Sequence, residues 1–443
     1  MNVAVVGTGY VGLVAGACLA EAGNFVTCVD ILEDRVNRLK DGATPIYEPG
    51  LSRLLGNNRK AGRLRFTTDY GEAVPGARAV FLAVGTPPGA DGQASVGHVI
   101  RAARSVGEHL SENATVVMKS TVPVGTSELV RKELSEAGAR GFQMCANPEF
   151  LKQGDAVNDF MYPDRVVCGV DSDVARDTMA RLYAPFVRSG RPVLFMDIPS
   201  AELAKYAANT MLAARISFMN ELSRLCEVTG ADIEDVRRAI GTDPRIGPYF
   251  LYAGTGFGGS CFPKDVAALV SAGKARGVDL QVADAVLRAN TIQCTVLVRK
   301  IVRRFATDLT GRRFAVWGLA FKPETDDTRQ APSLKIIREL LDAGATVAVH
   351  DPAAMEKAKA ELPPRGVDYC DNEYDALDGA DGLVMVTEWM QYRQPDWQQV
   401  AARMKHGIVF DGRNVFDPRL MRERGFEHYP IGRIQTGPDL IDA

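Results

Sequence analysis

The sequence lacks the patterns that mark several common protein classes. It has eight cysteines, but no two are spaced as C-x-x-C, and its five histidines show neither H-x-x-x-H nor E-x-x-H spacing. A disulfide scaffold and a zinc-dependent alcohol dehydrogenase are therefore not expected. No apolar run approaches the roughly 20 residues that a membrane-spanning helix needs, and the first residues do not resemble a signal peptide.

The chain also lacks an excess of positive charge. The net charge of −3 gives no global basic field to hold nucleic acid or an acidic membrane, so neither partner is expected. With 46% hydrophobic and 24% charged residues, the composition is typical of a globular protein. Four cysteines (18, 28, 145 and 168) lie in apolar stretches, which favours reduced thiols and a cytoplasmic location.

The first third of the chain alternates between strand and helix patterns. Apolar runs predict strands at 2–6, 25–29, 79–84, 114–118, 142–146 and 165–169. Helical patterns lie between several of them, for instance at 11–22 and 97–110. Alternation of this kind predicts a parallel sheet with helices on both faces.

A glycine-rich motif follows the first predicted strand and opens the first predicted helix. Gly7-Thr8-Gly9-Tyr10-Val11-Gly12 has the form G-x-G-x-x-G, and Asp30 follows 23 residues after Gly7. In this context the glycines allow a tight turn, a close approach of pyrophosphate and close helix packing. A carboxylate at Asp30 would bind ribose hydroxyls and repel a 2′-phosphate, which favours NAD over NADP, although Arg35 weakens that preference.

The opening pattern returns near residue 312 after a region of long helices. Residues 201–229 have apolar residues at helical spacing without Pro or Gly, and a second helical stretch covers 281–304. We therefore predict an α/β protein with two Rossmann-like doubly wound parallel-sheet domains, joined by a central long-helix region. The predicted domains are residues 1–198, 199–305 and 306–443, and a cleft between the sheet domains is the expected binding site.

A second glycine-rich segment leads to a cysteine. Residues 254–265 read Gly-Thr-Gly-Phe-Gly-Gly-Ser-Cys-Phe-Pro-Lys-Asp. The glycines suggest a flexible, exposed turn, which is unusual before a core thiol, and Pro263 suits the first turn of a helix. Cys261 would then lie at a helix N-terminus, where the dipole and a nearby cation favour the thiolate. Asp265, one turn away, could act as a base or orient a water.

Other polar residues have less specific patterns. Lys205 and Asn209 are spaced i, i+4, so they could donate hydrogen bonds to one oxyanion or form an ordinary solvated pair. Thr86, Thr121 and Glu149 each follow a predicted strand, where ligands bind in parallel sheets, but turn chemistry would explain them equally well.

Taken together, the motifs resemble those of the UDP-glucose 6-dehydrogenases, in the UDP-glucose/GDP-mannose dehydrogenase family, over nearly the whole chain. The matching segments are 7–12, Tyr-Glu-Pro-Gly-Leu at 47–51, 120–126, Asn-Pro-Glu-Phe-Leu at 147–151, Glu202 to Asn209, Arg245-Ile-Gly, 256–265, Ala-Phe-Lys-Pro at 320–323, 327–329 and 411–414. The resemblance implies a four-electron oxidation of the sugar C6 from alcohol to carboxylate with two NAD. It also implies that NAD binds the first domain and the nucleotide sugar largely the last, in a homodimer joined through the long helix.

The same resemblance implies catalytic roles. Cys261 would be the nucleophile that forms a thiohemiacetal and then a thioester, as covalent catalysis requires. Lys205 and Asn209 would hold the C6 oxygen, Asp265 and Thr121 would position and activate a water, and Glu149 would assist thioester hydrolysis.

The resemblance further implies two sets of binding residues. The expected cofactor contacts are Gly7, Gly9, Tyr10, Val11, Gly12, Asp30, Arg35, Thr86, Thr121, Gln153, Lys264 and Arg329. The expected substrate contacts are Glu149, Phe150, Leu151, Lys152, Lys205, Asn209, Arg245, Phe250, Leu251, Tyr252, Ala253, Gly254, Gly258, Lys322 and Arg413, of which Arg245 would reach a neighbouring subunit's site. The family commonly has Glu where this chain has Gln153, so any acid–base role at that position is lost.

Three alternatives stay open from the sequence. The same thiol chemistry could act on GDP-mannose or a UDP-N-acetylhexosamine. A two-electron hydroxyacid dehydrogenase could use Lys205 and would not need Cys261. A nucleotide-binding sensor without turnover would leave the cluster of Lys205, Asn209, Cys261 and Asp265 unexplained.

Overall fold

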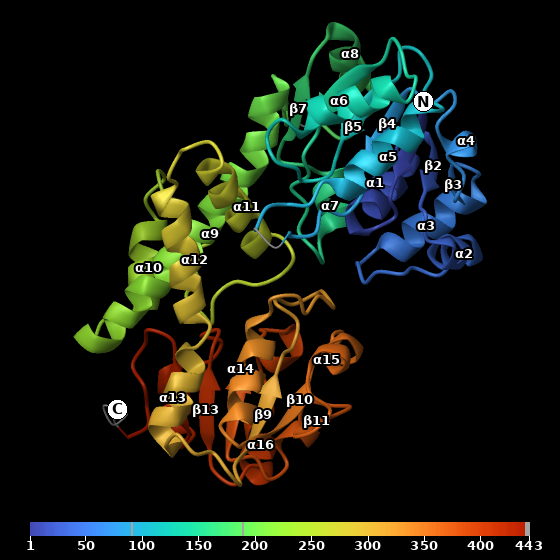
Figure 1. The fold of residues 1–443 in the computed structure, drawn as a ribbon. Helices are drawn as coiled ribbons and strands as arrows, with labels where there is room; N and C mark the ends of the chain where they lie inside the picture. The colour runs from blue at the N-terminus through green and yellow to red at the C-terminus, as the bar shows by residue number, and fades with distance from the viewer. Residues whose placement is uncertain (90–91, 188–189, 439–443) are drawn as a thin grey trace. The chain divides into compact units, whose positions relative to one another are not determined.

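The chain forms two compact units in the computed structural model, which describes residues 1–89, 92–187 and 190–438 (Figure 1). The first unit comprises Met1–Ala208 and Ser271–Arg276, and the second comprises Asn209–Val270 and Gly277–Ala443. Among the described residues, each unit contains one sheet. Within the described ranges, no helix combines the length and the apolar character that crossing a membrane demands.

The first sheet has eight strands in the order β3-β2-β1-β4-β5-β6-β7-β8. Their bounds are β1 Asn2–Val6, β2 Phe25–Val29, β3 Leu64–Thr67, β4 Ala79–Leu82, β5 Thr115–Met118, β6 Gln143–Ala146, β7 Val166–Val170 and β8 Val193–Met196. All neighbours are parallel except β6 and β7, which pair antiparallel through two residues of each strand. The strand order reverses between β1 and β4, where an open α/β sheet binds its ligand.

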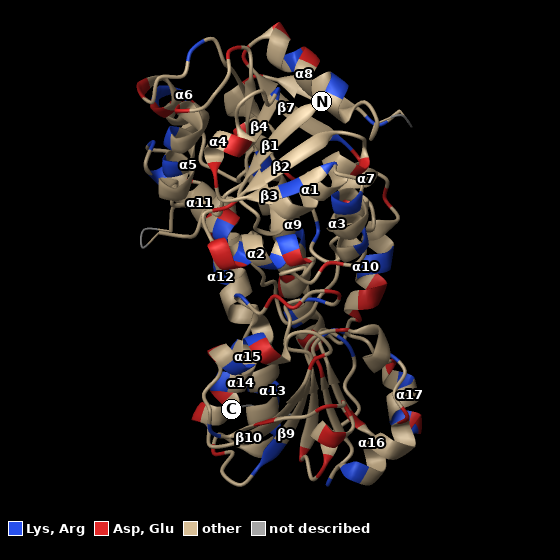
Figure 2. Cartoon of the chain, turned by 90° about the vertical axis from the view of Figure 1, so that its right-hand side faces the viewer, with Lys and Arg blue, Asp and Glu red and all other residues tan. Residues whose placement is uncertain are grey.

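Alternate residues of these strands face two separate cores. Val3 and Val5 of β1 belong to one core, and Ala4 and Val6 belong to the other. Because both faces are covered, the strands read as continuous apolar runs, and Figure 2 shows Lys, Arg, Asp and Glu mainly on helices and loops. The first core is covered by α1 Tyr10–Glu21, α2 Glu33–Asp41, α3 Leu51–Lys60, α7 Ala156–Met161 and α8 Asp173–Tyr183, and the second by α4 Tyr70–Ala73, α5 Gly97–Gly107 and α6 Thr126–Glu136.

The predicted long helix is α9, Ile198–Thr229, of 32 residues, and it runs from the first unit into the second. It starts where Asp197 accepts a hydrogen bond from Ser200 N at 2.8 Å, with Pro199 in the first turn. The helices α10 Ile233–Gly241, α11 Phe262–Lys274, α12 Gln281–Gln293 and α13 Val296–Phe305 follow it.

The single helical stretch expected at 281–304 is two helices, α12 and α13. The break falls at Cys294 and Thr295, and Thr295 Oγ1 donates to Ile292 O at 2.8 Å. A hydroxyl that bonds a nearby carbonyl competes with the helical hydrogen bond, and apolar periodicity carries no sign of this.

The second sheet has six parallel strands in the order β11-β10-β9-β12-β13-β14. Their bounds are β9 Arg313–Trp317, β10 Thr346–His350, β11 Val367–Tyr369, β12 Gly382–Met385, β13 Ile408–Asp411 and β14 Glu427–Pro430. One face packs on α13, α14 Pro332–Asp342 and α15 Met355–Glu361, and the other on α16 Trp397–Arg403, α17 Pro418–Glu423 and the short helices η1 Asp375–Leu377 and η2 Met390–Tyr392. The predicted α/β class with two doubly wound sheets is therefore confirmed, whereas the residue boundaries of three domains stay a prediction.

The turn after β9 requires glycine. Gly318 has φ +96°, and a Cβ placed there would lie 2.3 Å from Thr387 Cβ. At Gly425, φ is also positive at +79°, but a Cβ would meet no described atom within 4 Å. Alanine at Gly425 would therefore carry only the backbone cost of a positive φ. Alanine at Gly318 would carry the same cost and a steric clash as well.

Gly318→Ala is expected to destabilise the second sheet more than Gly425→Ala. Both substitutions carry a backbone cost of about 1–2 kcal/mol, and the clash at Gly318 adds roughly 1–3 kcal/mol. The chain's three tryptophans, Trp317, Trp389 and Trp397, all lie in this sheet domain, so tryptophan fluorescence in a urea titration reports it selectively. Equal urea midpoints of unfolding for the two variants would contradict a steric clash at Gly318.

Candidate active site

The glycine loop after β1 has the backbone that a dinucleotide site needs. Gly7 has φ +97° and its N–H donates to Val29 O at 2.8 Å. A Cβ on Gly12 would lie 2.0 Å from Gly7 O, whereas a Cβ on Gly9 would meet no described atom within 4 Å. The backbone is therefore closed toward the sheet and open beside Gly9, where the first N–H groups of α1 can bind an anion. Tyr10 and Val11 are the first residues of that helix.

Asp30 is fixed at the end of β2, next to this loop. Its Oδ2 accepts hydrogen bonds from Thr8 N and Thr8 Oγ1, both at 2.7 Å, and its Oδ1 accepts one from Leu32 N at 3.0 Å. Burial alone would raise the pKa of Asp30, but these donors and Arg35 hold it below its usual value. Arg35 Nη1 lies 3.5 Å from Asp30 Oδ2, so its charge is directed to the carboxylate. A fixed carboxylate suits ribose hydroxyls, and the loop therefore fits NAD.

Thr86 and Thr121 meet beyond the ends of β4 and β5. Thr86 Oγ1 donates to Thr121 O at 2.9 Å, and Thr86 is buried. Both residues thus lie at the carboxyl edge of the first sheet, on the side where the glycine loop is.

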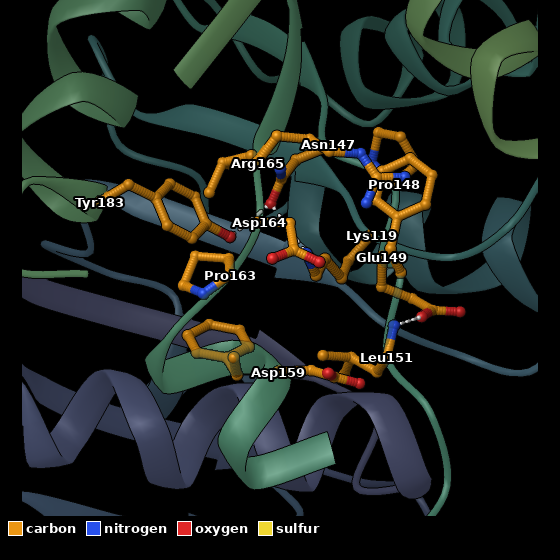
Figure 3. A pocket seen from close by; sticks show the side chains of 13 residues that line it. Lys119, Asn147, Pro148, Glu149, Leu151, Asp159, Pro163, Asp164, Arg165 and Tyr183 are labelled. Carbon is orange, nitrogen blue, oxygen red and sulfur yellow. Dashed lines mark hydrogen bonds between the residues drawn. The ribbon is translucent and has the colours of Figure 1, made fainter. Parts of the chain in front are cut away.

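The loop after β6 contains a buried ion pair. Lys205 Nζ of α9 lies 3.2 Å from Glu149 Oε1, and the two side chains are 4% and 8% exposed. Glu149 Oε2 also accepts a hydrogen bond from Leu151 N at 2.6 Å, drawn in Figure 3. Burial alone would raise the pKa of Glu149, but Lys205, Leu151 N–H and Lys119 lower it. The carboxylate is therefore held ionised in a fixed orientation.

Lys119 is a second buried cation near Glu149, and sequence analysis assigns it no specific role. Its Nζ donates to Asn147 Oδ1 at 3.1 Å, and the same oxygen accepts a 2.6 Å hydrogen bond from the Tyr183 hydroxyl. Burial lowers the pKa of Lys119 to about 8, although Glu149 opposes the shift. Lys119, Asn147 and Glu149 line a small cavity, seen in Figure 3. The only sequence signal was the position of Lys119 at a strand end.

The rest of this loop is partly exposed. The Phe150 ring lies 4.0 Å from the Arg165 guanidinium carbon and 5.2 Å from Lys205 Nζ. Lys152 is exposed and pairs with Asp155 at 3.1 Å and Asp159 at 3.0 Å. Gln153 is half-buried.

The glycine segment before Cys261 is not the flexible, exposed turn expected from the sequence. Residues 253–259 are buried in the second unit. A Cβ on Gly258 would lie 2.3 Å from Gln330 O, and one on Gly256 would lie 2.7 Å from Asn290 Oδ1. The expectation was wrong because glycine here serves close backbone packing, and composition does not distinguish that from mobility.

Cys261 immediately precedes α11, as predicted. Asp265 N donates to Cys261 O at 2.8 Å, and Pro263 lies in the first turn of the helix. The thiol is half-buried, whereas burial raises the pKa of both Cys18 and Cys28 to about 12. Accessible thiols at helix N-termini are the reactive ones, and buried thiols are inert.

Asn209 and Asp265 are paired in the second unit. Asn209 Nδ2 donates to Asp265 Oδ2 at 2.7 Å, and Lys264 Nζ donates to Asp265 Oδ1 at 2.5 Å. Asp265 is 1% exposed, Asn209 6% and Lys205 3%. Lys205 and Asn209 are therefore not a solvated pair, because each is buried with its own carboxylate partner.

A further cation lies close to the Cys261 thiol. Arg329 forms a 2.6 Å ion pair with Asp327, and its backbone O accepts a hydrogen bond from Gly259 N at 2.9 Å. The hydrogen bond to Asp327 raises the pKa of Arg329, and the Cys261 thiol adds to the rise.

The segment Phe250–Gly254 is anchored by two buried amides that the sequence did not indicate. Asn220 Oδ1 accepts from Gly254 N at 2.8 Å, and Gln293 Nε2 donates to Gly254 O at 2.7 Å. Leu251 and Ala253 are buried, whereas Tyr252 is 59% exposed. No motif surrounds Asn220 or Gln293, so their roles could be found only from the fold.

The remaining expected substrate residues divide into two groups. Arg413 lies beside this segment, because a Cβ on Gly254 would be 3.3 Å from Arg413 Nη1, and its Nε donates to Val386 O at 2.7 Å. Lys322 follows β9 at the carboxyl edge of the second sheet and is half-buried. Arg245, in contrast, is 86% exposed and pairs with Asp243 at 2.6 Å.

Three parts of the chain match domains of one family. Residues 1–187 match the NAD binding domain of the UDP-glucose/GDP-mannose dehydrogenase family, residues 199–292 match its central domain, and residues 315–418 match its UDP binding domain. The first match contains the glycine loop and Asp30, the second contains Cys261 and Asp265, and the third contains Lys322 and Arg413.

Relatives of known name cover nearly the whole chain. The UDP-glucose 6-dehydrogenase of Pseudomonas aeruginosa is 47% identical over 446 residues, covering 99% of this chain and 98% of the relative. The structure of a UDP-glucose dehydrogenase from Pyrobaculum islandicum has a TM-score of 0.90 and 40% identity, and 97% of each chain is covered. A UDP-D-ManNAc dehydrogenase from Pyrococcus horikoshii has a TM-score of 0.86 and 27% identity, with 98% and 99% covered. This chain therefore belongs to the UDP-glucose/GDP-mannose dehydrogenase family.

Proposed function

We propose that this protein oxidises UDP-glucose at C6 to UDP-glucuronate, using two NAD and a covalent intermediate on Cys261. The observation that carries the proposal is a half-buried thiol at the N-terminus of α11, one helical turn from the buried Asn209–Asp265 pair. The primary alcohol, two NAD and one water become a carboxylate, two NADH and three protons. Four electrons leave C6 in two hydride steps.

The first unit would hold NAD. The glycine loop Gly7–Gly12 offers helix N–H groups to the pyrophosphate, and Asp30 offers its carboxylate to the ribose. When bound, NAD accepts the hydride that leaves C6. Thr86, Thr121 and Gln153 on the same unit, and Lys264 and Arg329 on the second unit, are proposed as further contacts.

Cys261 would act between the two oxidations. Its Sγ adds to the C6 aldehyde to form a thiohemiacetal, loss of the second hydride gives a thioester, and water then releases the carboxylate and the thiol. The helix N-terminus and Arg329 stabilise negative charge on Sγ. Covalent capture also keeps the aldehyde from leaving before its second oxidation.

Buried polar groups would stabilise the charges that develop at C6. Lys205 and Asn209 are proposed to hold the C6 oxygen, since an ammonium and an amide can each serve more than one acceptor. Asp265 and Thr121 would position and activate water. Glu149, kept ionised by Lys205 and Lys119, would assist thioester hydrolysis, a role that the neutral Gln153 cannot share.

The substrate assignment rests on graded similarity. The UDP-glucose enzymes of Pseudomonas aeruginosa and Pyrobaculum islandicum are 47% and 40% identical to this chain, whereas the UDP-D-ManNAc enzyme is 27% identical. UDP-glucose is therefore preferred over an N-acetylated sugar. The segment Phe250–Gly254, Gly258, Lys322 and Arg413 are proposed to bind the nucleotide sugar, together with Glu149 to Lys152.

A homodimer is proposed through α9. Met211, Phe218 and Leu225 recur every seven residues along the helix and are 63%, 54% and 55% exposed. A row of large apolar side chains at this spacing needs a partner to cover it. Exposed Arg245 could then reach the site of the second copy. A cytoplasmic location is also proposed, since Cys18, Cys28, Cys145 and Cys168 are buried thiols, as expected for a reducing compartment, and cell fractionation would test it.

Cys261→Ala is expected to abolish turnover while leaving NAD binding intact. Removal of a catalytic nucleophile commonly lowers kcat by more than about a thousandfold. NADH formation with UDP-glucose measures the loss, and mass spectrometry of the quenched wild-type enzyme should detect a sugar adduct on Cys261. Cys370→Ala is the matched control, because Cys370 is the other half-buried cysteine and should leave kcat unchanged. Full turnover by Cys261→Ala would exclude the thioester route.

Phe218→Glu is expected to shift the protein from dimer to monomer, because it places a charge in the centre of the apolar row. Light scattering coupled to size exclusion measures the mass directly. Leu420→Glu is the control, since Leu420 is 47% exposed on α17, away from α9. A monomeric wild-type protein, or a dimer that survives Phe218→Glu, would refute this interface.

A further inference from the structure

Glu48 belongs to a motif that the proposed chemistry does not use. It lies in Tyr47-Glu48-Pro49-Gly50-Leu51, in the turn before α3, and is only 7% exposed. A carboxylate buried to this degree needs hydrogen-bond donors to compensate for lost hydration. Its donors come from two distant parts of the first unit.

The Glu48 carboxylate joins the loop after β6 to the first residue of α1. Its Oε2 accepts a hydrogen bond from Gly154 N at 2.8 Å and another from the Tyr10 hydroxyl, and its Oε1 accepts one from Ala156 N at 2.8 Å. Gly154 N also lies 3.2 Å from the Tyr10 hydroxyl oxygen. Burial, followed by the bond to Glu48, raises the pKa of Tyr10, so the phenol stays protonated and donates.

Glu48 caps the N-terminus of α7 in place of Asp155, the residue at the N-cap position. Asp155 occupies the N-cap position of α7 but makes no side-chain cap bond there, and its carboxylate lies 3.1 Å from Lys152 Nζ instead. The first N–H groups of α7 are met by Glu48, which is more than a hundred residues away in sequence. Gly154 has φ +85°, a conformation that this anchor holds in place.

The anchored segment supplies a contact that orients the Glu149 carboxylate, and Lys205 supplies another. Leu151 N donates to Glu149 Oε2 at 2.6 Å, and Lys152 N donates to Asp159 Oδ2 at 2.7 Å. Leu151 is three residues before Gly154, so we expect a shift at Gly154 to displace the N–H group that binds the Glu149 carboxylate. Glu48 would thus act on Glu149 through the short peptide segment from Gly154 back to Leu151.

We propose that Glu48, with the Tyr10 hydroxyl, is a positioning residue for the second half of the reaction, in which the thioester is hydrolysed. The inference rests on the proposed function, because it uses the role given to Glu149. A remote cap that merely stabilises α7 would lower the amount of folded protein. A positioning residue also changes which step limits turnover.

Glu48→Gln tests this directly. The amide keeps the size of the side chain, but its NH2 group faces backbone N–H groups in place of an acceptor. We expect kcat to fall about 10- to 100-fold, the scale of a small misplacement of a catalytic group. We also expect the thioester on Cys261 to accumulate in turnover samples quenched at saturating NAD, so that a change in NAD affinity through Tyr10 or Gln153 does not account for it. Glu21→Gln is the matched control, since Glu21 accepts a 2.7 Å hydrogen bond from Asn58 at the far end of α1, and should behave as wild type.

Amide hydrogen exchange gives a readout that does not require activity. Peptides covering 150–157 should exchange faster in Glu48→Gln than in wild type, and peptides from β1, β4 and β5 should be unchanged. A folded Glu48→Gln enzyme with wild-type kcat and no adduct would overturn the proposal, as would unaltered exchange at 150–157.

If Glu48→Gln does not fold, Tyr10→Phe is the variant to test, because it removes only the hydroxyl shared by Glu48 and Gly154. A kcat reduced about 3- to 10-fold with adduct accumulation would support the proposal. Wild-type kcat without adduct would refute it. If the wild-type enzyme does not oxidise UDP-glucose, the proposed function fails, and hydrogen exchange alone decides whether Glu48 anchors the loop.

Discussion

The place of Cys261 depends on backbone packing that no side chain would permit. Gly256 and Gly258 bring the chain against Asn290 and Gln330, and Gly259 N is hydrogen-bonded to Arg329 O. The chain then enters α11 at once, so the thiol is left at the helix N-terminus, half-buried and beside a cation. Rigidity upstream of a nucleophile limits the geometries that it samples, which is the condition for efficient attack. Glycines that predict a flexible turn from the sequence alone are therefore, in the fold, the residues that allow this close and rigid packing.

Buried charge is the second constraint on the site. Lys205 with Glu149, and Asn209 with Asp265, are nearly inaccessible to solvent, and each is satisfied by a specific partner. Burying such groups costs several kcal/mol per ion before pairing, so they are weak evidence of stability and better evidence of function. Lys119 adds a cation whose pKa burial lowers to about 8, close to neutral pH. In the proposed mechanism, the groups that would stabilise developing charge are already oriented before substrate binds, which is the condition for electrostatic catalysis.

Local patterns predicted much of this molecule, and long-range contacts account for most of what they missed. The strands β1, β2, β4 and β5 were found because both of their faces are buried, and the helix of Cys261 was found from Pro263 and the glycines. The short strands β3 and β8 are not predicted, because Leu-Arg-Phe-Thr of β3 mixes apolar and polar residues, and the four apolar residues Val-Leu-Phe-Met of β8 are too few to show a period. Glu48, Asn220 and Gln293 act on backbone groups far away in sequence, and spacing rules cannot reveal such partners.

The proposed reaction would use residues of both units. The first contains the dinucleotide loop, Asp30 and Glu149, and the second contains Cys261, Asp265 and the segment Phe250–Gly254. The measurement that tests the central claim most directly is the amount of NADH formed when limiting UDP-glucose is consumed to completion with excess NAD. A four-electron oxidation captured on Cys261 predicts two NADH per sugar and a carboxylate product. One NADH per sugar, with the aldehyde released, would contradict it.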